Sequence, residues 1–160
     1  MGCGKSSVGR ELSQLLCCPF MDLDQVIEER AGRTIPEIFS QDGEPEFRRI
    51  ELEALKHIVG ERPSLVLALG GGAVMTAECA EIVRSETLCV YLRASVDTLM
   101  EHLEGQTDNR PLLSYADLRN RITELMAIRS ATYENTAHII IDIDGKSIEA
   151  IASEIISRLG

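Results

Sequence analysis

Apolar residues follow two alternating patterns along this chain. After Ser6, the residues Val8, Leu12 and Leu15 recur at the spacing of one helix face, which predicts an amphipathic helix over about residues 5–17. Short segments of strand length lie at 20–22, 65–69, 88–92 and 138–142. Helical spacing predicts further helices over about residues 25–32, 44–59, 76–84, 95–103, 117–133 and 147–159.

Local signals predict where some of these helices begin and end. Thr34 and Glu37 stand at the spacing of a capping box, with Pro36 in the first turn of another short helix. Asp24 is expected to cap the helix that follows it, and Gly32 to end that helix.

The alternation of strands and helices predicts the fold class. Strands separated by helices imply right-handed crossovers and a doubly wound α/β sheet. The uninterrupted apolar run from Leu65 to Leu69 suits a strand that is buried on both faces of a parallel sheet. No repeat or linker divides the sequence, so we expect a single domain over residues 1–160.

Acidic residues outnumber basic ones in this chain. Its 160 residues include 16 Lys and Arg against 26 Asp and Glu, which gives a formal net charge of −10. This balance argues against a general nucleic-acid or anionic-membrane surface, because binding a phosphate backbone needs a basic face. A small anionic ligand held by a few local arginines is compatible with it.

The sequence carries no signal for export or metal binding. The apolar runs are far shorter than the roughly 20 residues that span a bilayer, and the N-terminus lacks the apolar segment of a signal peptide. The five cysteines include no C-x-x-C pair, so reduced thiols are expected. No histidine has a partner at metal-ligand spacing. We therefore expect a cytoplasmic protein without a metal site built from these side chains.

A glycine-rich segment at the N-terminus carries the strongest chemical signal. Gly2-Cys3-Gly4-Lys5-Ser6 matches the end of the phosphate-binding loop G-x-x-x-x-G-K-[ST], and a predicted amphipathic helix follows it. In such a loop backbone N–H groups surround phosphate oxygens, the lysine reaches the β and γ phosphates, and the hydroxyl ligates Mg²⁺. The alternative is a glycine-rich tail with a solvated lysine.

This loop motif is incomplete. Its opening glycine would stand five positions before Gly4, and no apolar strand precedes it, although a phosphate loop normally links a strand to a helix. We therefore expect that the chain lacks its first strand and that Met1 is an internal methionine.

Asp22 and Asp24 form a second candidate site. They lie two residues apart at the end of a predicted strand, where alternation would place both carboxylates on one face. Ligands of open α/β sheets bind at the carboxyl ends of strands, so this pair would face the phosphates. The alternative is that Asp24 only caps the next helix and that Asp22 is exposed.

Further segments follow the GCGKS motif in a specific order. They read FMDLDQVIEERAGRTIPEIFSQDGEPEFRRIE, LALGGGAV, NRPLL and LMAIRSATYENTA. Over nearly the whole chain, this order and spacing resemble shikimate kinase. The resemblance implies a three-layer P-loop kinase fold with a parallel sheet of order 2-3-1-4-5, whose central strand is the one missing here. It also implies a substrate-binding region over about 24–51 and a lid over about 104–116.

The resemblance further implies a reaction. The protein would transfer the γ-phosphate of ATP to the 3-hydroxyl of shikimate in aromatic amino-acid synthesis, with Mg²⁺ as cofactor. We expect a monomer whose partners are these small molecules, without a nucleic-acid or membrane partner.

Residue roles carry over from the resemblance by position. The nucleotide-binding set is Gly2, Cys3, Gly4, Lys5, Ser6, Ser7 and the lid residue Arg110. The Mg²⁺ set is Ser6 and Asp22. The shikimate-binding set is Asp24, Arg48, Gly70, Gly71, Gly72 and Arg129, with both arginines on the carboxylate. The catalytic set is Lys5, Asp24 and Arg110, with Asp24 at the accepting hydroxyl and a candidate to take its proton.

Several of these residues also have a simpler interpretation. Glu44 stands four residues before Arg48, the spacing of an exposed helix ion pair, and Arg49 is the preferred surface residue of the two arginines. Arg129 could pack on Tyr133. The glycine run could be only a flexible turn, and the lid arginine could be solvated.

Other positions leave alternatives open. Phe39 and Phe47 could line the substrate pocket, but their helical spacing favours core packing. Some family members place an arginine before the lid to stack on adenine, whereas this chain reads MEHLEGQT there, so adenine contacts are open and residues 143–146 are one candidate. A gluconate-kinase-like sugar kinase, or a nucleotide-binding module inactive through truncation, are the alternative functions.

Overall fold

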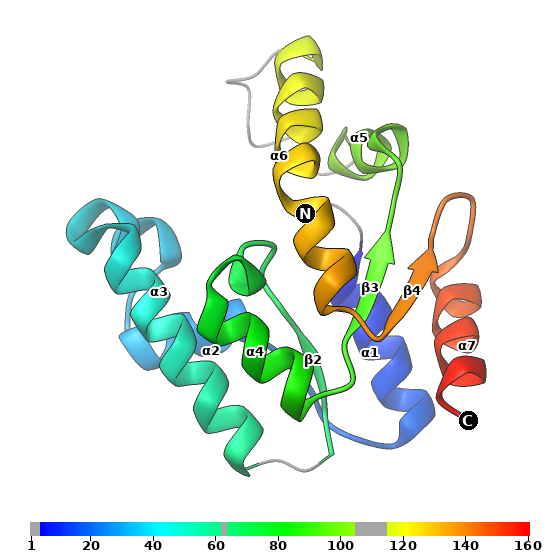
Figure 1. The fold of residues 1–160 in the computed structure, drawn as a ribbon, viewed down its shortest axis with the longest axis horizontal. Helices are drawn as coiled ribbons and strands as arrows, with labels where there is room; N and C mark the ends of the chain where they lie inside the picture. The colour runs from blue at the N-terminus through cyan, green and yellow to red at the C-terminus, as the bar shows by residue number, and fades with distance from the viewer. Residues whose placement is uncertain (1–3, 62–63, 105–114) are drawn as a thin grey trace.

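The computed structural model describes residues 4–61, 64–104 and 115–160. Its helices are α1 (Lys5–Leu16), α2 (Leu23–Ala31), α3 (Ile35–Glu61), α4 (Ala77–Glu86), α5 (Val96–Glu104), α6 (Tyr115–Thr136) and α7 (Ile148–Leu159), with a 3₁₀ turn η1 (Ala73–Met75). Its strands are β1 (Phe20–Asp22), β2 (Val66–Ala68), β3 (Val90–Arg93) and β4 (Ile139–Asp142). These elements lie close to where the sequence pattern predicts them (Figure 1).

The strands form two separate parallel pairs. β1 pairs with β2 in a register that sets Phe20 against Val66, and β3 pairs with β4 with Val90 against Ile139. In the described ranges no strand lies between β2 and β3. The α/β class is confirmed, and the pairing of β1 with β2 and of β3 with β4 agrees with the two outer pairs of the order 2-3-1-4-5.

Helices connect and cover the two strand pairs. α1 contacts β1, β2 and α7, and so reaches both halves of the fold. α3 packs on α2 and α4, while α6 contacts α4, α5 and η1. Figure 1 shows α2, α3 and α4 gathered beside β2, and α7 beside β4.

The region between β1 and β2 contains the predicted helix signals. The capping box is confirmed, since Thr34 N–H donates to Glu37 and Glu37 N–H donates to the Thr34 hydroxyl, both at 3.3 Å. The two helices predicted after Thr34 form one element, α3, with a kink where Gly43 has φ of 82° and ψ of 173°. This left-handed φ favours glycine and lets the chain turn between the two segments.

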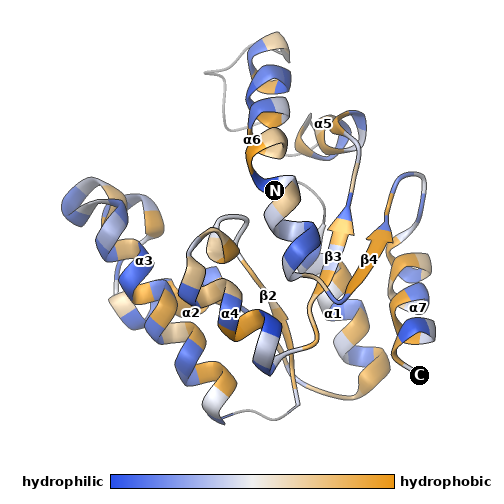
Figure 2. Cartoon of the chain, viewed as in Figure 1, coloured by the Kyte–Doolittle hydropathy of each residue, from blue (hydrophilic) through white to orange (hydrophobic). Residues whose placement is uncertain are grey.

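The buried core falls into three clusters. One joins α1, α5, α6, α7 and β4 around Val8, Met100, Ile122, Ile141 and Ile155. A second lies between α2 and α3 around Leu23, Ile27 and Ile38, and a third joins α3 to α4 through Leu55, Val74, Cys79 and Val83. Figure 2 shows β2, β3 and β4 as mainly hydrophobic, beside helices in which hydrophobic and hydrophilic residues alternate.

The sequence analysis expects the cysteines to be reduced thiols. Cys17, Cys18, Cys79 and Cys89 are free thiols, while Cys3 lies outside the described residues. Burial raises the pKa of both Cys79 and Cys89 to about 11, so these two thiols stay protonated at neutral pH.

Among the described helices, none combines the length and apolar composition needed to cross a bilayer.

Candidate functional site

The N-terminal end of α1 carries the described part of the predicted phosphate loop. Gly4 is the N-cap residue of this helix and has φ of 77°, a left-handed conformation that favours glycine. The first N–H groups of a helix have no partner within it, and the helix dipole adds positive potential there. Such helix ends bind anions. Gly2 and Cys3, the other predicted loop residues, lie outside the described residues.

Asp22 connects the end of β1 to this helix terminus. Its Oδ2 accepts a hydrogen bond from the Ser6 hydroxyl at 3.0 Å, and its Oδ1 accepts one from Asp24 N–H at 3.0 Å. The second bond makes Asp22 the N-cap of α2. The prediction that Asp24 caps this helix is wrong, because α2 already begins at Leu23 and Asp24 lies in its first turn. Strand alternation therefore does not determine how the two carboxylates are oriented.

Asp24 lies beside the glycine turn that follows β2. A Cβ atom on Gly70 would stand 2.9 Å from Asp24 Oδ1, so the approach depends on glycine. Burial, and then the negative charge of Asp22, raise the pKa of Asp24, while Lys5 and Arg48 act against this rise. Asp24 is therefore a half-buried carboxyl group within the electrostatic reach of two cations.

The glycine turn also contacts two other elements. A Cβ atom on Gly72 would stand 2.5 Å from Arg48 Nη2 on α3. The carbonyl oxygen of Gly71 accepts a hydrogen bond from the hydroxyl of Tyr133 on α6. Side chains of this chain thus approach Gly70 and Gly72 closely, and the turn is held by α6 rather than being only a flexible connection. Contacts of these glycines with a substrate remain a prediction.

Arg48 is a half-buried cation held by its own helix. Its Nη1 lies 2.8 Å from Glu51 Oε1 and its Nη2 lies 3.5 Å from Glu44 Oε1. The guanidinium carbon also lies 5.1 Å from the centre of the Phe47 ring. The predicted pair with Glu44 therefore exists, but it does not leave Arg48 on the surface, since 22% of the side chain is exposed.

Two further predictions about this helix have mixed outcomes. Arg49 is 54% exposed and pairs with Glu46 and Glu53, so its assignment to the surface is confirmed. Phe47 packs in the core, as helical spacing predicts. Phe39 is instead exposed and contacts Phe47 with ring centres 4.7 Å apart, so core packing is wrong for Phe39.

Glu51 is a site residue that the sequence analysis did not identify. Its side chain is only 1% exposed, although glutamate is rarely buried without a partner. Burial raises the pKa of Glu51, and the hydrogen bond from Arg48 acts in the opposite direction. The sequence feature that could have identified Glu51 is its position three residues after Arg48. This is also the spacing of an ordinary surface ion pair, so it does not distinguish the two cases.

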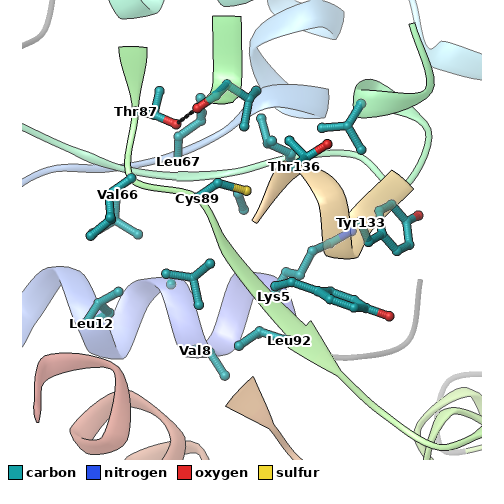
Figure 3. A pocket seen from close by; sticks show the side chains of 18 of the residues that line it. Lys5, Val8, Leu12, Val66, Leu67, Thr87, Cys89, Leu92, Tyr133 and Thr136 are labelled. Atoms are coloured by element: carbon teal, nitrogen blue, oxygen red, sulfur yellow. Dashed lines mark hydrogen bonds between the residues drawn. The ribbon is translucent and has the colours of Figure 1, made fainter. Parts of the chain in front are cut away.

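A cavity of about 720 Å³ opens next to the glycine turn. Lys5, Gly70, Gly71, Arg129 and Tyr133 all belong to its wall, and Figure 3 shows Lys5 extending toward Tyr133. The structure thus brings Arg129 to the same space as the glycine turn. Arg110 and most of the predicted lid lie outside the described residues.

The loop suggested for adenine contacts is held by internal bonds. The carboxylate of Asp144 accepts a hydrogen bond from Ser95 N–H at 3.0 Å, and Lys146 lies 2.6 Å from Glu154. Gly145 supplies the left-handed turn with φ of 71°. An adenine contact of this loop remains a prediction.

The arrangement can bind an anion and accept a proton at neighbouring places. A helix N-terminus with Lys5 lies at one side, and Asp24 and Arg48 flank the glycine turn at the other. The chain has a net charge of −10, yet these cations converge on one region. Such a site suits a small, negatively charged substrate rather than a polyanion.

Comparison with known proteins identifies the relatives of this chain. The shikimate kinase family model matches residues 1–160. The chain is 39% identical to the shikimate kinase of Dictyoglomus turgidum over 161 residues, which covers 99% of this chain and 92% of that protein. It is 41% identical over 159 residues to a shikimate kinase of Thermus thermophilus, covering 99% of this chain and 85% of the relative.

Solved structures agree with these sequence matches. The shikimate kinase from Acinetobacter baumannii in complex with shikimate superposes with a TM-score of 0.89 at 34% identity, covering 99% of this chain and 88% of that one. The shikimate kinase from Bacteroides thetaiotaomicron gives a TM-score of 0.90 at 28% identity, covering 99% and 93%. The P-loop kinase fold and the match over all 160 residues place this chain in the shikimate kinase family.

Proposed function

We propose that this protein transfers the γ-phosphate of ATP to the 3-hydroxyl of shikimate, giving shikimate 3-phosphate and ADP. The observation that carries the proposal is the glycine turn, where Asp24 meets Gly70 and Arg48 meets Gly72. A carboxylate from α2 and a guanidinium from α3 therefore approach one backbone segment at two glycines that stand two residues apart. An acceptor with both a hydroxyl and a carboxylate group is complementary to that pair.

Arg48 and Arg129 bind the carboxylate of shikimate in this proposal. Guanidinium groups bind carboxylates through two parallel hydrogen bonds, and two such groups fix the orientation of the ligand. Gly70, Gly71 and Gly72 add backbone contacts, which the lack of side chains permits. The position of Arg48 against Glu51 supports this role, because a paired guanidinium is held in place before the ligand arrives.

Asp24 orients the accepting hydroxyl and takes its proton. Burial and Asp22 raise the pKa of this carboxyl, which makes it a better proton acceptor than an ordinary aspartate as long as it is ionised. Lys5 and Arg48 favour the ionised form at neutral pH. Phosphoryl transfer needs little covalent chemistry from the protein, so positioning and electrostatics supply most of the catalysis.

The nucleotide phosphates lie at the N-terminus of α1. Gly2, Cys3, Gly4 and Ser7 supply backbone contacts, while Lys5 reaches the transferred phosphoryl group. Arg110 closes over the phosphates from the lid at about 104–116 and excludes water. The left-handed backbone of Gly4 and the helix that starts directly after it support this placement.

The donor set at Ser6 and Asp22 fits Mg²⁺. The Ser6 hydroxyl and a carboxylate oxygen of Asp22 lie 3.0 Å apart beside the helix terminus. Mg²⁺ prefers oxygen ligands and commonly binds through one or two carboxylates, water and substrate phosphates. When bound it neutralises charge on the β and γ phosphates, and Asp22 and Ser6 would hold it. We also infer that the protein is cytoplasmic, because the free thiols of the described cysteines suit a reducing compartment. We further propose that it acts as a monomer.

A coupled assay of ADP release with a panel of acceptors tests the proposed function. We expect ATP-dependent turnover with shikimate, and none with gluconate or with an analogue whose carboxylate is reduced to an alcohol. Arg48→Ala should raise the KM for shikimate, whereas Arg49→Ala, a matched change on the outer face of α3, should leave it unchanged. Turnover with gluconate would favour a sugar kinase, and ATP binding without turnover on any acceptor would favour a nucleotide-binding module.

A further inference from the structure

The long helix α3 consists of two helical segments joined by a kink. The first covers residues 35–42 and the second 44–61, with Gly43 between them in a left-handed conformation. Pro45 follows two residues later and has no N–H group to donate to the carbonyl of Gln41, as a residue of a continuous helix would. Glycine is also the residue with the widest backbone freedom. The backbone therefore does not fix the angle between the two segments by itself.

Arg33 holds the end of the first segment. It lies in the connection between α2 and α3, and its Nη2 stands 2.7 Å from Asp42 Oδ2. Its Nη1 donates a hydrogen bond to Gln41 Oε1 at 2.9 Å. One guanidinium thus binds both residues that precede the kink, and its planar shape orients two acceptors at once. A cation at this end of a helical segment also interacts favourably with the partial negative charge of the last carbonyl groups.

Arg33 also faces the second segment. The hydrogen bond from Arg49 lowers the pKa of Glu46, and the positive charge of Arg33 contributes further to this lowering. Glu46 lies beyond Gly43, so the guanidinium of Arg33 stands within electrostatic reach of both sides of the kink. Its side chain is only 29% exposed, which limits screening by the solvent. Arg33 thus braces the kink from outside the helix.

An aromatic contact links the first segment to Arg48. Phe39 on the first segment and Phe47 on the second have ring centres 4.7 Å apart. The guanidinium carbon of Arg48 lies 5.1 Å from the centre of the same Phe47 ring. A change in the kink angle moves Phe39 relative to Phe47, and so alters the packing of the ring that Arg48 contacts. The kink angle is therefore coupled to the position of Arg48.

Other contacts hold the beginning of the first segment. The capping box of Thr34 and Glu37 closes its first turn, and Ile38 is fully buried in the core between α2 and α3. Without Arg33 the segment would therefore stay folded and attached, while its end at Gly43 would be free to tilt. A loss of geometry at the kink is thus separable from unfolding.

We propose that Arg33 is a positioning residue for acceptor binding, because it fixes the kink of α3 and with it the place of Arg48. Arg33 acts through the two aromatic rings and not by contact with the ligand. The inference rests on the proposed function, in which Arg48 binds the carboxylate of shikimate. Loss of the ion pair before the kink should weaken binding of the acceptor and leave binding of ATP unchanged.

Arg33→Gln and Asp42→Asn test this proposal by kinetics, since each removes one charge of the pair. We expect each to raise the KM for shikimate about three- to tenfold, as for the loss of a charged hydrogen bond or ion pair, with an unchanged KM for ATP. The double variant should be no worse than the more affected single one, because effects within one pair are not additive. Arg30→Gln, an exposed change in the last turn of α2, removes the same charge nearby and should change neither constant.

Fluorine NMR follows the kink independently of catalysis. The chain contains three Phe, so labelling with 4-fluorophenylalanine gives one signal for each, assigned by replacing each Phe with Leu in turn. Arg33→Gln should shift the signals of Phe39 and Phe47 and leave that of Phe20, on β1, in place. Arg30→Gln should move none of them. If the wild type does not phosphorylate shikimate, the proposed function fails, while these shifts still show whether Arg33 sets the kink.

Two results would overturn the proposal. An unchanged KM for shikimate in Arg33→Gln, or an equal rise of both KM values, would make the ion pair a feature of stability alone. A raised KM for shikimate with unmoved Phe39 and Phe47 signals would show that Arg33 does not act through the kink. Thermal unfolding confirms that each variant is folded, and if Arg33→Gln does not fold, Asp42→Asn decides by the same two readouts.

Discussion

Arg48 and Glu51 form a close ion pair at the centre of the candidate site, with Nη1 of the arginine 2.8 Å from Oε1 of the glutamate. The glutamate is buried, and the arginine is partly exposed toward the glycine turn. Glu51, one turn further along α3, therefore holds the guanidinium group through Nη1, while Nη2 of Arg48 approaches Gly72. This geometry makes Glu51 a positioning residue for Arg48.

Glu51→Gln tests the positioning role. The amide keeps the size of the side chain but removes the charge, so Arg48 would lose a charge-assisted hydrogen bond worth about 1.5–3 kcal/mol in typical proteins. Part of this loss should appear in binding, and we expect the KM for shikimate to rise by about tenfold while the KM for ATP stays the same. Steady-state kinetics with each substrate varied in turn measure both constants.

Glu53→Gln is the matched control for this change, because Glu53 is exposed on the same helix and pairs with Arg49. It should leave both KM values unchanged. A parallel rise of both constants in Glu51→Gln, or a loss of folded protein with an unchanged shikimate KM, would assign Glu51 to stability alone.

Gly72→Ala is predicted to displace the guanidinium of Arg48. The new Cβ atom would stand 2.5 Å from Nη2, closer than such contacts allow, and the end of the arginine side chain would have to move. We expect a raised KM for shikimate with little change in thermal stability, because a flexible side chain can shift at low cost.

Gly60→Ala is the control for the glycine substitution. Nothing lies within 4 Å of its Cβ position, and the residue is exposed near the end of α3. Alanine should stabilise the helix by up to about 1 kcal/mol without an effect on kinetics. If Gly72→Ala keeps the wild-type KM, the approach of Arg48 to the turn has no role in binding.

Tyr133→Phe is predicted to loosen the glycine turn from α6. The substitution removes the hydroxyl that donates to Gly71 and keeps the ring that packs 5.1 Å from Tyr91. The loss of one hydrogen bond should cost about 1 kcal/mol of stability. We expect a higher KM for shikimate than in the wild type, measured beside a urea unfolding curve, and a change in stability alone would contradict a role of this bond in the site.

The fold was largely predictable because its elements depend on local patterns. The spacing of Val8 and Leu12, the apolar run at 65–69 and the box of Thr34 and Glu37 are signals read within a few residues, and each predicts the observed element. The helix cap at Asp22 was missed because the strand before it is only three residues long. A shift of one residue in that boundary changes which aspartate is the cap.

The contacts within the candidate site were less predictable. The burial of Glu51 depends on how α3 packs against the rest of the molecule, and nothing in the sequence distinguishes Glu51 from the exposed Glu53 on the same helix. The bond from Tyr133 to Gly71 joins residues 62 positions apart and follows no motif. By contrast, Gly70 and Gly72 could be predicted because a glycine run at the end of a buried strand often marks a close approach to the backbone.

Asp24→Asn should abolish turnover and at the same time stabilise the protein at neutral pH. The pKa of Asp24 is raised in the folded state, mainly by burial, so the folded protein binds this proton more readily than the unfolded chain does. Above the folded-state pKa the ionised carboxyl therefore costs stability. This cost disappears as the pH falls through the folded-state pKa toward the ordinary value of 3.8. For the same reason, activity of the wild type should decline on acidification before an ordinary aspartate would be protonated.

Urea unfolding at pH 7 and at pH 4 measures the effect on stability. Asp24→Asn should be more stable than the wild type at pH 7, and the difference should shrink at pH 4, while Glu29→Gln, an exposed change on the same helix, should show no such pH dependence. ATP binding should survive in Asp24→Asn, because Lys5 and Ser6 lie on another element. A variant that is less stable at pH 7 would mean that interactions of the ionised carboxyl outweigh its burial, and near-normal turnover would remove Asp24 from the acceptor site.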